Sequence, residues 1–178
     1  MLVTCNLSEA SLNDPGVCGE LAEMIARHGV RPGEVGVEVE SGLLKSGAVH
    51  TRGNIERLHA AGVTVILDNF GSDATSLGAL TEYAVDMVKI HSRLLPDGSE
   101  SEDILRPRLR LLSNTIGLCK KLGFRIICVG VENTARHTIV RKLGCDFAEG
   151  YHYFRPMPCD EFDRSFADTH AVPPALGI

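Results

Sequence analysis

Short apolar runs alternate with longer amphipathic stretches along the whole chain, and this alternation limits the fold more than any other feature. The clearest run is residues 63–67, which is apolar or β-branched at every position and lies between Gly62 and Asp68. A parallel strand buried on both faces has this composition. We predict strands at residues 2–5, 35–39, 63–67, 87–90, 125–129 and 145–148. Helical spacing of apolar residues predicts helices at residues 15–28, 48–60, 76–83, 107–122, 135–143 and 160–166.

Strands and helices that alternate singly are joined by right-handed crossovers and form a parallel sheet. The expected fold class is therefore α/β with about six parallel strands. Two helix starts are marked in the sequence. Asp14 precedes Pro15, a capping residue followed by a residue suited to the first helical position. Pro107 is expected to begin the long helix, because proline is poorly tolerated further inside a helix.

Composition excludes several classes of function. The 178 residues are 44% hydrophobic and 23% charged, which is typical of one globular domain. A net charge of −5 and an aromatic content of 5% argue against a partner that is a nucleic acid polymer. We expect no membrane span, because no apolar run approaches 18 residues. The six scattered cysteines and the lack of a visible signal peptide favour reduced thiols and a cytoplasmic location over disulfides or a zinc site.

Polar residues stand where the predicted strands end. The carboxyl ends of parallel strands meet at one rim of the sheet, where ligands bind in α/β folds. Asparagine and carboxylate oxygens suit Mg²⁺, Mn²⁺ or Ca²⁺, and a lysine beside them suits a phosphate or an activated water. Any one such residue is more often a helix cap or a solvated loop residue, so the prediction of a site depends on their coincidence. The residues are Asn6, Glu38, Asp68, Lys89, Glu132 and Glu149.

Seven short motifs also follow one another along the chain. Residues 68–71, Asp-Asn-Phe-Gly, resemble the Asp-Asp-Phe-Gly loop of the EAL domain family, and residues 129–132, Val-Gly-Val-Glu, resemble its Glu-Gly-Val-Glu segment. The order and spacing of all seven make the resemblance specific, and it covers nearly the whole chain. The other five motifs lie at residues 6–8, 37–40, 88–91, 144–146 and 149–156.

The resemblance implies a TIM-like barrel that hydrolyses cyclic di-GMP to linear pGpG, with Mg²⁺ or Mn²⁺ assisting the attack of water. By position, Asn6, Glu38 and Asp68 match metal ligands. Lys89 matches the lysine near the attacked phosphate, and Glu132 matches a supporting glutamate. The positions that match the ligand-binding cleft are Asn69, Phe70, Gly71, Glu149, Gly150, Arg155 and Pro156.

Several departures from the family pattern bear on activity. Asn69 replaces the second aspartate of the Asp-Asp pair, and Glu149 replaces the usual glutamine. Val129 replaces the first glutamate of Glu-Gly-Val-Glu, a position that the resemblance assigns to a metal ligand and to the base for the attacking water. Valine has no group for either role. The Glu-Ala-Leu signature has no match in the sequence, so we predict no useful phosphodiesterase activity.

Chain length adds a structural expectation. A TIM barrel has eight strands and typically about 250 residues, whereas six strands are predicted here. The motif order implies that the first two strands of the family barrel are missing. We therefore expect an incomplete barrel with an exposed edge that needs cover. Residues 1–167 are expected to form this partial EAL-like domain, and residues 168–178 a C-terminal tail.

Three hypotheses about function follow. The first is a catalytically inactive EAL-type module that binds a protein partner, a second copy of itself or cyclic di-GMP in bacterial second-messenger signalling. The second is an active, metal-dependent cyclic di-GMP phosphodiesterase. The third is a fragment with no independent function. Calorimetry with cyclic di-GMP separates the first from the third.

Overall fold

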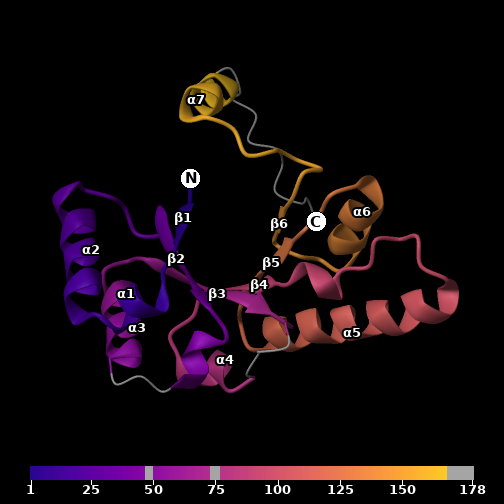
Figure 1. Cartoon of the computed structure of the whole chain (residues 1–178), viewed down its shortest axis with the longest axis horizontal. Coiled ribbons are helices and arrows are strands. Elements are labelled where there is room, and N and C mark those ends of the chain that lie inside the picture. Colours follow the sequence, from indigo (N-terminus) through magenta and orange to yellow (C-terminus); the bar gives the residue numbers. More distant parts are fainter. Residues whose placement is uncertain (47–49, 73–76, 168–178) are drawn as a thin grey trace.

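The centre of the molecule is one parallel sheet of six strands. The computed structural model describes residues 1–46, 50–72 and 77–167. The strands lie in chain order across the sheet, which curls into an open half-barrel with helices on its outside (Figure 1). The predicted incomplete TIM-like barrel of six strands is confirmed. The strands are β1 (Val3–Asn6), β2 (Val35–Glu40), β3 (Thr64–Phe70), β4 (Met87–Ile90), β5 (Arg125–Val129) and β6 (Phe147–Glu149).

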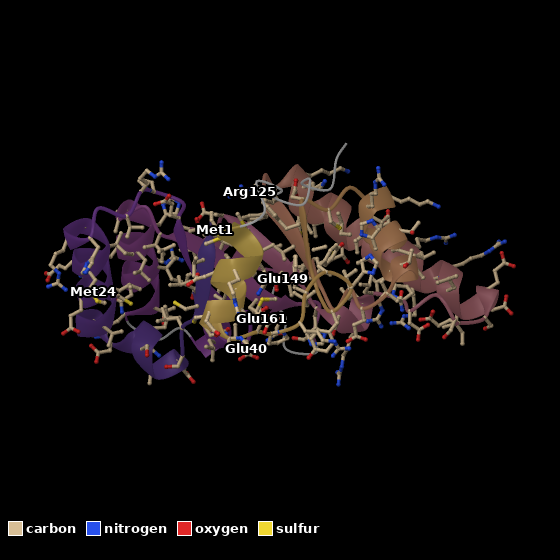
Figure 2. All side chains as sticks on the ribbon, turned by 90° about the horizontal axis from the view of Figure 1, so that it is seen from above. Met1, Met24, Glu40, Arg125, Glu149 and Glu161 are labelled. Carbon is tan, nitrogen blue, oxygen red and sulfur yellow. The ribbon has the colours of Figure 1, made fainter. Side chains whose placement is uncertain are left out.

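Seven α-helices lie in the described part of the chain: α1 (Glu9–Asn13), α2 (Pro15–Arg27), α3 (Thr51–Ala60), α4 (Ala79–Glu82), α5 (Glu102–Lys121), α6 (Thr134–Lys142) and α7 (Cys159–Ala167). The start of α2 is as predicted, because the Asp14 carboxylate accepts hydrogen bonds from the backbone N–H groups of Gly16 and Val17. Helix α7 stands apart from the sheet in Figure 1 and, seen from above in Figure 2, lies over the middle of the chain.

The predicted start of the long helix at Pro107 is wrong. Helix α5 begins at Glu102, and Pro107 lies inside its second turn. Proline cannot donate a backbone hydrogen bond, and two other contacts stabilise the first turn. The backbone N–H of Leu105 donates to the carbonyl of Ser101 over 2.9 Å, and the guanidinium of Arg106 pairs with Glu102 over 2.5 Å. Pro107 is exposed to solvent.

The main hydrophobic core lies between the helices and the outer face of the sheet. In β2 and β3, Val37 lies opposite Val65, and both are fully buried. Leu112 of α5 and Leu58 of α3 belong to the same cluster and are also fully buried. Strands β2 to β5 are mostly buried because helices cover this face there, whereas Val3 and Cys5 of β1 stay exposed.

The inner face of the sheet carries a second and much smaller apolar cluster. Successive side chains of a strand point to opposite faces, so the neighbours of the outer-core residues face inward. Ile66, Met87 and Ile127 form this cluster, and Leu2 and Val129 pack against it. Towards the carboxyl ends of the strands the inner face becomes polar, which places the candidate site there.

Some predicted elements lie partly outside the described residues. The helix expected at 48–60 begins at residue 51, and the one expected at 76–83 is helical at 79–82. Residues 47–49 and 73–76 and the expected tail at 168–178 lie outside the described ranges. Within those ranges β1 and β6 each have one strand neighbour, so both edges of the sheet are open. No helix in the described part has the length and apolar character needed to cross a membrane.

Candidate functional site

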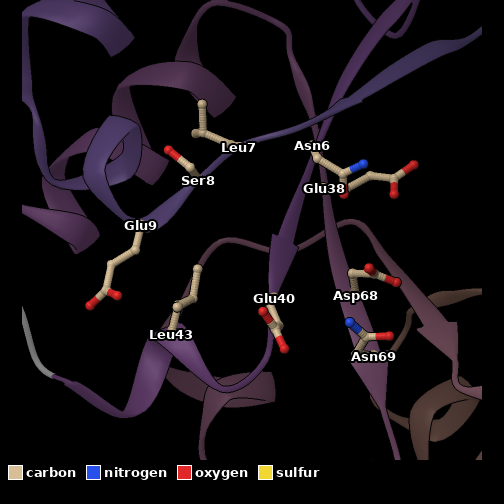
Figure 3. Close-up of a pocket in the computed structure, with 9 residues that line it drawn as sticks. All are labelled: Asn6, Leu7, Ser8, Glu9, Glu38, Glu40, Leu43, Asp68 and Asn69. Atoms are coloured by element: carbon tan, nitrogen blue, oxygen red, sulfur yellow. The ribbon is translucent and has the colours of Figure 1, made fainter.

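The ends of β1, β2 and β3 surround a hollow of about 410 Å³, which we call the acidic hollow. The strand register places Asn6 opposite Glu38 and Glu40 opposite Asp68. In Figure 3 the side chains of Asn6, Glu38 and Asp68 extend to the same side of the strands. The three residues predicted as metal ligands therefore share one hollow. Its lining is Asn6, Leu7, Ser8, Glu9, Glu38, Glu40, Leu43, Asp68 and Asn69.

Lys89 links this hollow to the far side of the site. Its ammonium donates to Oε1 of Glu38 over 2.7 Å and lies 3.1 Å from Oε2 of Glu149. Lys89 and Glu38 are both 7% exposed, whereas the Glu149 side chain is 50% exposed. Burial favours the neutral form of Lys89 and by itself lowers its pKa. The hydrogen bond to Glu38 and the charge of Glu149 outweigh burial, so the pKa of Lys89 is raised.

The Mg²⁺ or Mn²⁺ ion that the resemblance implies is a poor match for the acidic hollow. The oxygens of Asn6, Glu38 and Asp68 are of the right chemical type. However, Oε1 of Glu38 already accepts hydrogen bonds from Thr4 over 2.6 Å and from Lys89. Nowhere in residues 1–46, 50–72 and 77–167 are three His, Cys, Asp or Glu side chains placed to hold an ion. An ion at Glu38 would also be repelled by the adjacent ammonium, so the residues in this arrangement do not fit a divalent cation.

A bulge at the end of β3 sets the direction of the residues that follow Asp68. The pairing of β3 with β4 shifts register between Leu67 and Phe70, and Asn69 has a positive φ of 58°. Asparagine tolerates this conformation better than most residues. The bulge leaves Asn69 lining the acidic hollow. Phe70 instead joins the outer core at 2% exposure, so the structure does not bring this predicted ligand-binding residue into the acidic hollow.

Gly71 follows the bulge with φ of 90°, and a side chain there would overlap that of Leu94. Glycine is therefore favoured by the backbone conformation, while the overlap involves the movable end of the Leu94 side chain. Like Phe70, Gly71 does not line the acidic hollow. Its contribution to the site is to let the chain turn sharply after Asn69.

A second hollow, of about 490 Å³, lies at the ends of β5 and β6, and we call it the C-terminal hollow. Val129 of β5 lies opposite Glu149 of β6. The guanidinium of Arg155 stacks over the ring of Tyr151, 4.5 Å from its centroid. Five predicted site residues thus come together here: Glu132, Glu149, Gly150, Arg155 and Pro156. The full lining is Val129, Gly130, Glu132, Glu149, Gly150, Tyr151, Phe154, Arg155 and Pro156.

Backbone contacts fix the shape of the C-terminal hollow. Gly150 has φ of 153°, and a Cβ there would overlap the backbone of Val131. The guanidinium of Arg136 donates to the carbonyl of Gly130 over 2.6 Å. It also lies 3.8 Å from the largely exposed carboxylate of Glu132. Glu132 therefore faces the open part of this hollow rather than Lys89.

Three residues of the site were missed in the sequence. Thr4 donates to Glu38, and its position two residues before Asn6 in β1 was a usable signal, since alternate residues of a strand share a face. Tyr151 is the stacking partner of Arg155, at the i,i+4 spacing visible in the sequence. Arg136 carried no signal, because its bond to Gly130 depends on how α6 packs against the loop.

Comparison with known proteins gives one consistent result. The EAL domain family matches residues 1–156. The cyclic di-GMP phosphodiesterase RocR of Pseudomonas aeruginosa is 26% identical over 159 residues, which are 88% of this chain and 39% of the relative. The chain spans 39% of the length of RocR and 19% of the length of an uncharacterized signaling protein of Caulobacter vibrioides, to which it is 28% identical.

Solved structures agree with the fold. The PaMucR phosphodiesterase in complex with c-di-GMP has a TM-score of 0.79 at 25% identity, over 90% of this chain and 64% of that one. The EAL domain of Mycobacterium smegmatis DcpA has a TM-score of 0.84 at 23% identity, over 94% of this chain and 73% of that one, and it supports the fold alone. The motifs, the half-barrel and the family match agree, and the chain belongs to the EAL domain family.

Proposed function

We propose that this EAL domain does not hydrolyse cyclic di-GMP and acts by binding. It binds a protein partner, a second copy of itself or cyclic di-GMP in cytoplasmic bacterial signalling. The observation that carries the proposal is the position of Val129. Its side chain packs on the apolar cluster of Ile66, Met87 and Ile127, at the point where the family pattern has a glutamate. The six free cysteines support a reducing compartment.

Loss of hydrolysis follows from the chemistry that the site would have to perform. Metal-assisted attack on a phosphodiester needs carboxylates that hold the ion and a base that activates water. Asn69 is neutral and Val129 is apolar, so two of those groups are missing. The buried carboxylate that is left, Glu38, is already paired with Lys89.

Nucleotide binding is supported by the C-terminal hollow. The guanidinium of Arg155, stacked over Tyr151, offers a planar cation, which suits a planar base linked to a phosphate. PaMucR, which this chain resembles in fold, was solved with c-di-GMP bound. Cyclic di-GMP is therefore the ligand we propose for this hollow.

Helix α5 supports pairing with a second copy. Ile104, Leu111, Leu118 and Leu122 are each at least 41% exposed and recur at intervals of seven, seven and four residues, so they form one stripe along the helix. The first turn of α5 is acidic and its last turn is basic. Two copies of α5 packed antiparallel would bury the stripe and bring opposite charges together.

The test of pairing is sedimentation of the chain and of its Leu111→Glu variant. We expect a dimer for the first and a monomer of unchanged fold for the second. A monomeric wild-type chain at high concentration would refute this part of the proposal.

The test of silent catalysis is an assay for linear pGpG with Mg²⁺ or Mn²⁺. We expect no product from the wild-type chain. An Asn69→Asp/Val129→Glu variant restores both carboxylates and shows whether their loss limits the reaction. Turnover by the wild-type chain would establish it as an active phosphodiesterase instead.

A further inference from the structure

The centre of the site holds a positive charge that belongs to the chain itself. Lys89 lies on β4, and its ammonium contacts carboxylates from β2 on one side and β6 on the other, at 2.7 and 3.1 Å. A third carboxylate, Asp68, lines the same acidic hollow as Glu38. The ammonium therefore lies among the negatively charged side chains of these strands.

We propose that Lys89 is the resident cation of this site: it holds Glu38 and Glu149 in the place of a divalent metal ion, so the chain folds and binds its ligand without Mg²⁺ or Mn²⁺. The part about ligand binding rests on the function proposed above. The part about metal does not, because it concerns only residues of this chain.

Burial keeps the ammonium where it is. The Lys89 side chain is 9% exposed, and its strand neighbour on the same face is the fully buried Met87. A buried ammonium without a partner is very unfavourable, so Lys89 has no alternative position of comparable energy. A divalent ion would have to displace it or bind beside it.

The departures from the family pattern are consistent with a single positive charge. Asn69 and Val129 each remove a carboxylate, while Glu149 adds one beside the lysine. The glutamine usual at position 149 would accept a hydrogen bond but bring no charge. Together these changes remove two carboxylates that could bind a metal ion and add one that pairs with Lys89.

The test measures Mn²⁺ binding by calorimetry and thermal unfolding in the wild-type chain and in Lys89→Met. We expect no binding to the wild-type chain and an unfolding midpoint that Mn²⁺ leaves unchanged. Lys89→Met leaves Glu38 without its cation, so we expect it to bind Mn²⁺ at least about tenfold more tightly than the weakest binding that the calorimeter detects, and to be stabilised by it, since removing one adjacent like charge strengthens cation binding. The control, Glu38→Gln/Lys89→Met, removes both charges and should show neither effect.

The inference would be overturned if the wild-type chain bound Mn²⁺ or Mg²⁺ stoichiometrically with a Kd below about 1 mM and Glu38→Gln abolished this binding. A Kd in the millimolar range marks weak binding. A folded Lys89→Met variant that binds no Mn²⁺ would also overturn it. If Lys89→Met yields no folded protein, the wild-type measurement alone decides. Absence of cyclic di-GMP binding, with or without EDTA, would count against nucleotide binding and leave the Mn²⁺ result standing.

Discussion

The two faces of the six-stranded sheet are stabilised in different ways. On the outer face, twenty-four buried apolar residues of the described part of the chain form one cluster with the helices. Among the same described residues, the buried apolar cluster of the inner face consists of Ile66, Met87 and Ile127, and that face becomes polar towards the rim. The comparison separates packing, which holds the fold, from a small set of charges and glycines, which shapes the site.

The difference explains how this domain keeps the fold while it departs from the family pattern. Val129 and Asn69 lie on or next to the inner face, where exchanging a carboxylate for an apolar or neutral group removes no outer-core contact. The outer core tolerates no comparable change, because each of its residues fills space between the sheet and a helix. Residues at the site can therefore change on the inner face while the outer core stays the same.

The largest expected effect on stability lies in the outer core. Leu112→Ala in α5 removes a fully buried side chain and should lower the free energy of unfolding by about 2–5 kcal/mol. The control is Met24 of α2, which is 45% exposed, and Met24→Ala should change that energy by less than about 0.5 kcal/mol. Urea denaturation measures both, and equal effects would show that the buried side chain contributes no more stability than an exposed one.

A smaller effect is expected at the rim of the inner face. Gly150→Ala forces a side chain into the backbone of Val131 and should lower the free energy of unfolding by about 1–3 kcal/mol. The control is Gly117, which lies inside α5 and has room for a Cβ, with no atom of a neighbouring element within 4 Å. Gly117→Ala should raise that energy by roughly 0.5–1 kcal/mol. A harmless Gly150→Ala would mean that the loop is free to rearrange.

The smallest perturbation is the labelling of thiols at pH 8. Burial raises the pKa of Cys119 to about 11, so only roughly one molecule in a thousand carries its thiolate at pH 8. Cys18, Cys128 and Cys145 are also buried, whereas Cys5 and Cys159 are exposed. We therefore expect two thiols to react quickly and four to react only after unfolding. Fast reaction of more than two would show that the outer core opens readily.

Much of the fold could be predicted from the sequence, because buried parallel strands have a strong apolar signature and Asp14-Pro15 marks a helix start. The short helix α1, at residues 9–13, and the true start of α5 were not predicted, since both depend on local hydrogen bonds at Ser8 and Ser101. Within the site, five of the six polar residues named at strand ends line one of the two hollows, and Lys89 does not. The strand ends did not predict that Phe70 turns into the core.

The pairing of Lys89 with Glu38 and Glu149 was also beyond the sequence. Three strands that are not neighbours contribute these residues, and their distances depend on how far the sheet curls. Spacing along the chain specifies the register of adjacent strands but carries no information on that curvature. Only the three-dimensional structure therefore shows this charge network.

The most direct test of a metal-independent, non-hydrolysing site is calorimetry of cyclic di-GMP with the folded chain, in EDTA and again with Mn²⁺, followed by chromatography of the nucleotide. The account predicts the same affinity in both conditions and recovery of intact cyclic di-GMP. Binding that requires Mn²⁺, or linear pGpG in the recovered nucleotide, would contradict it.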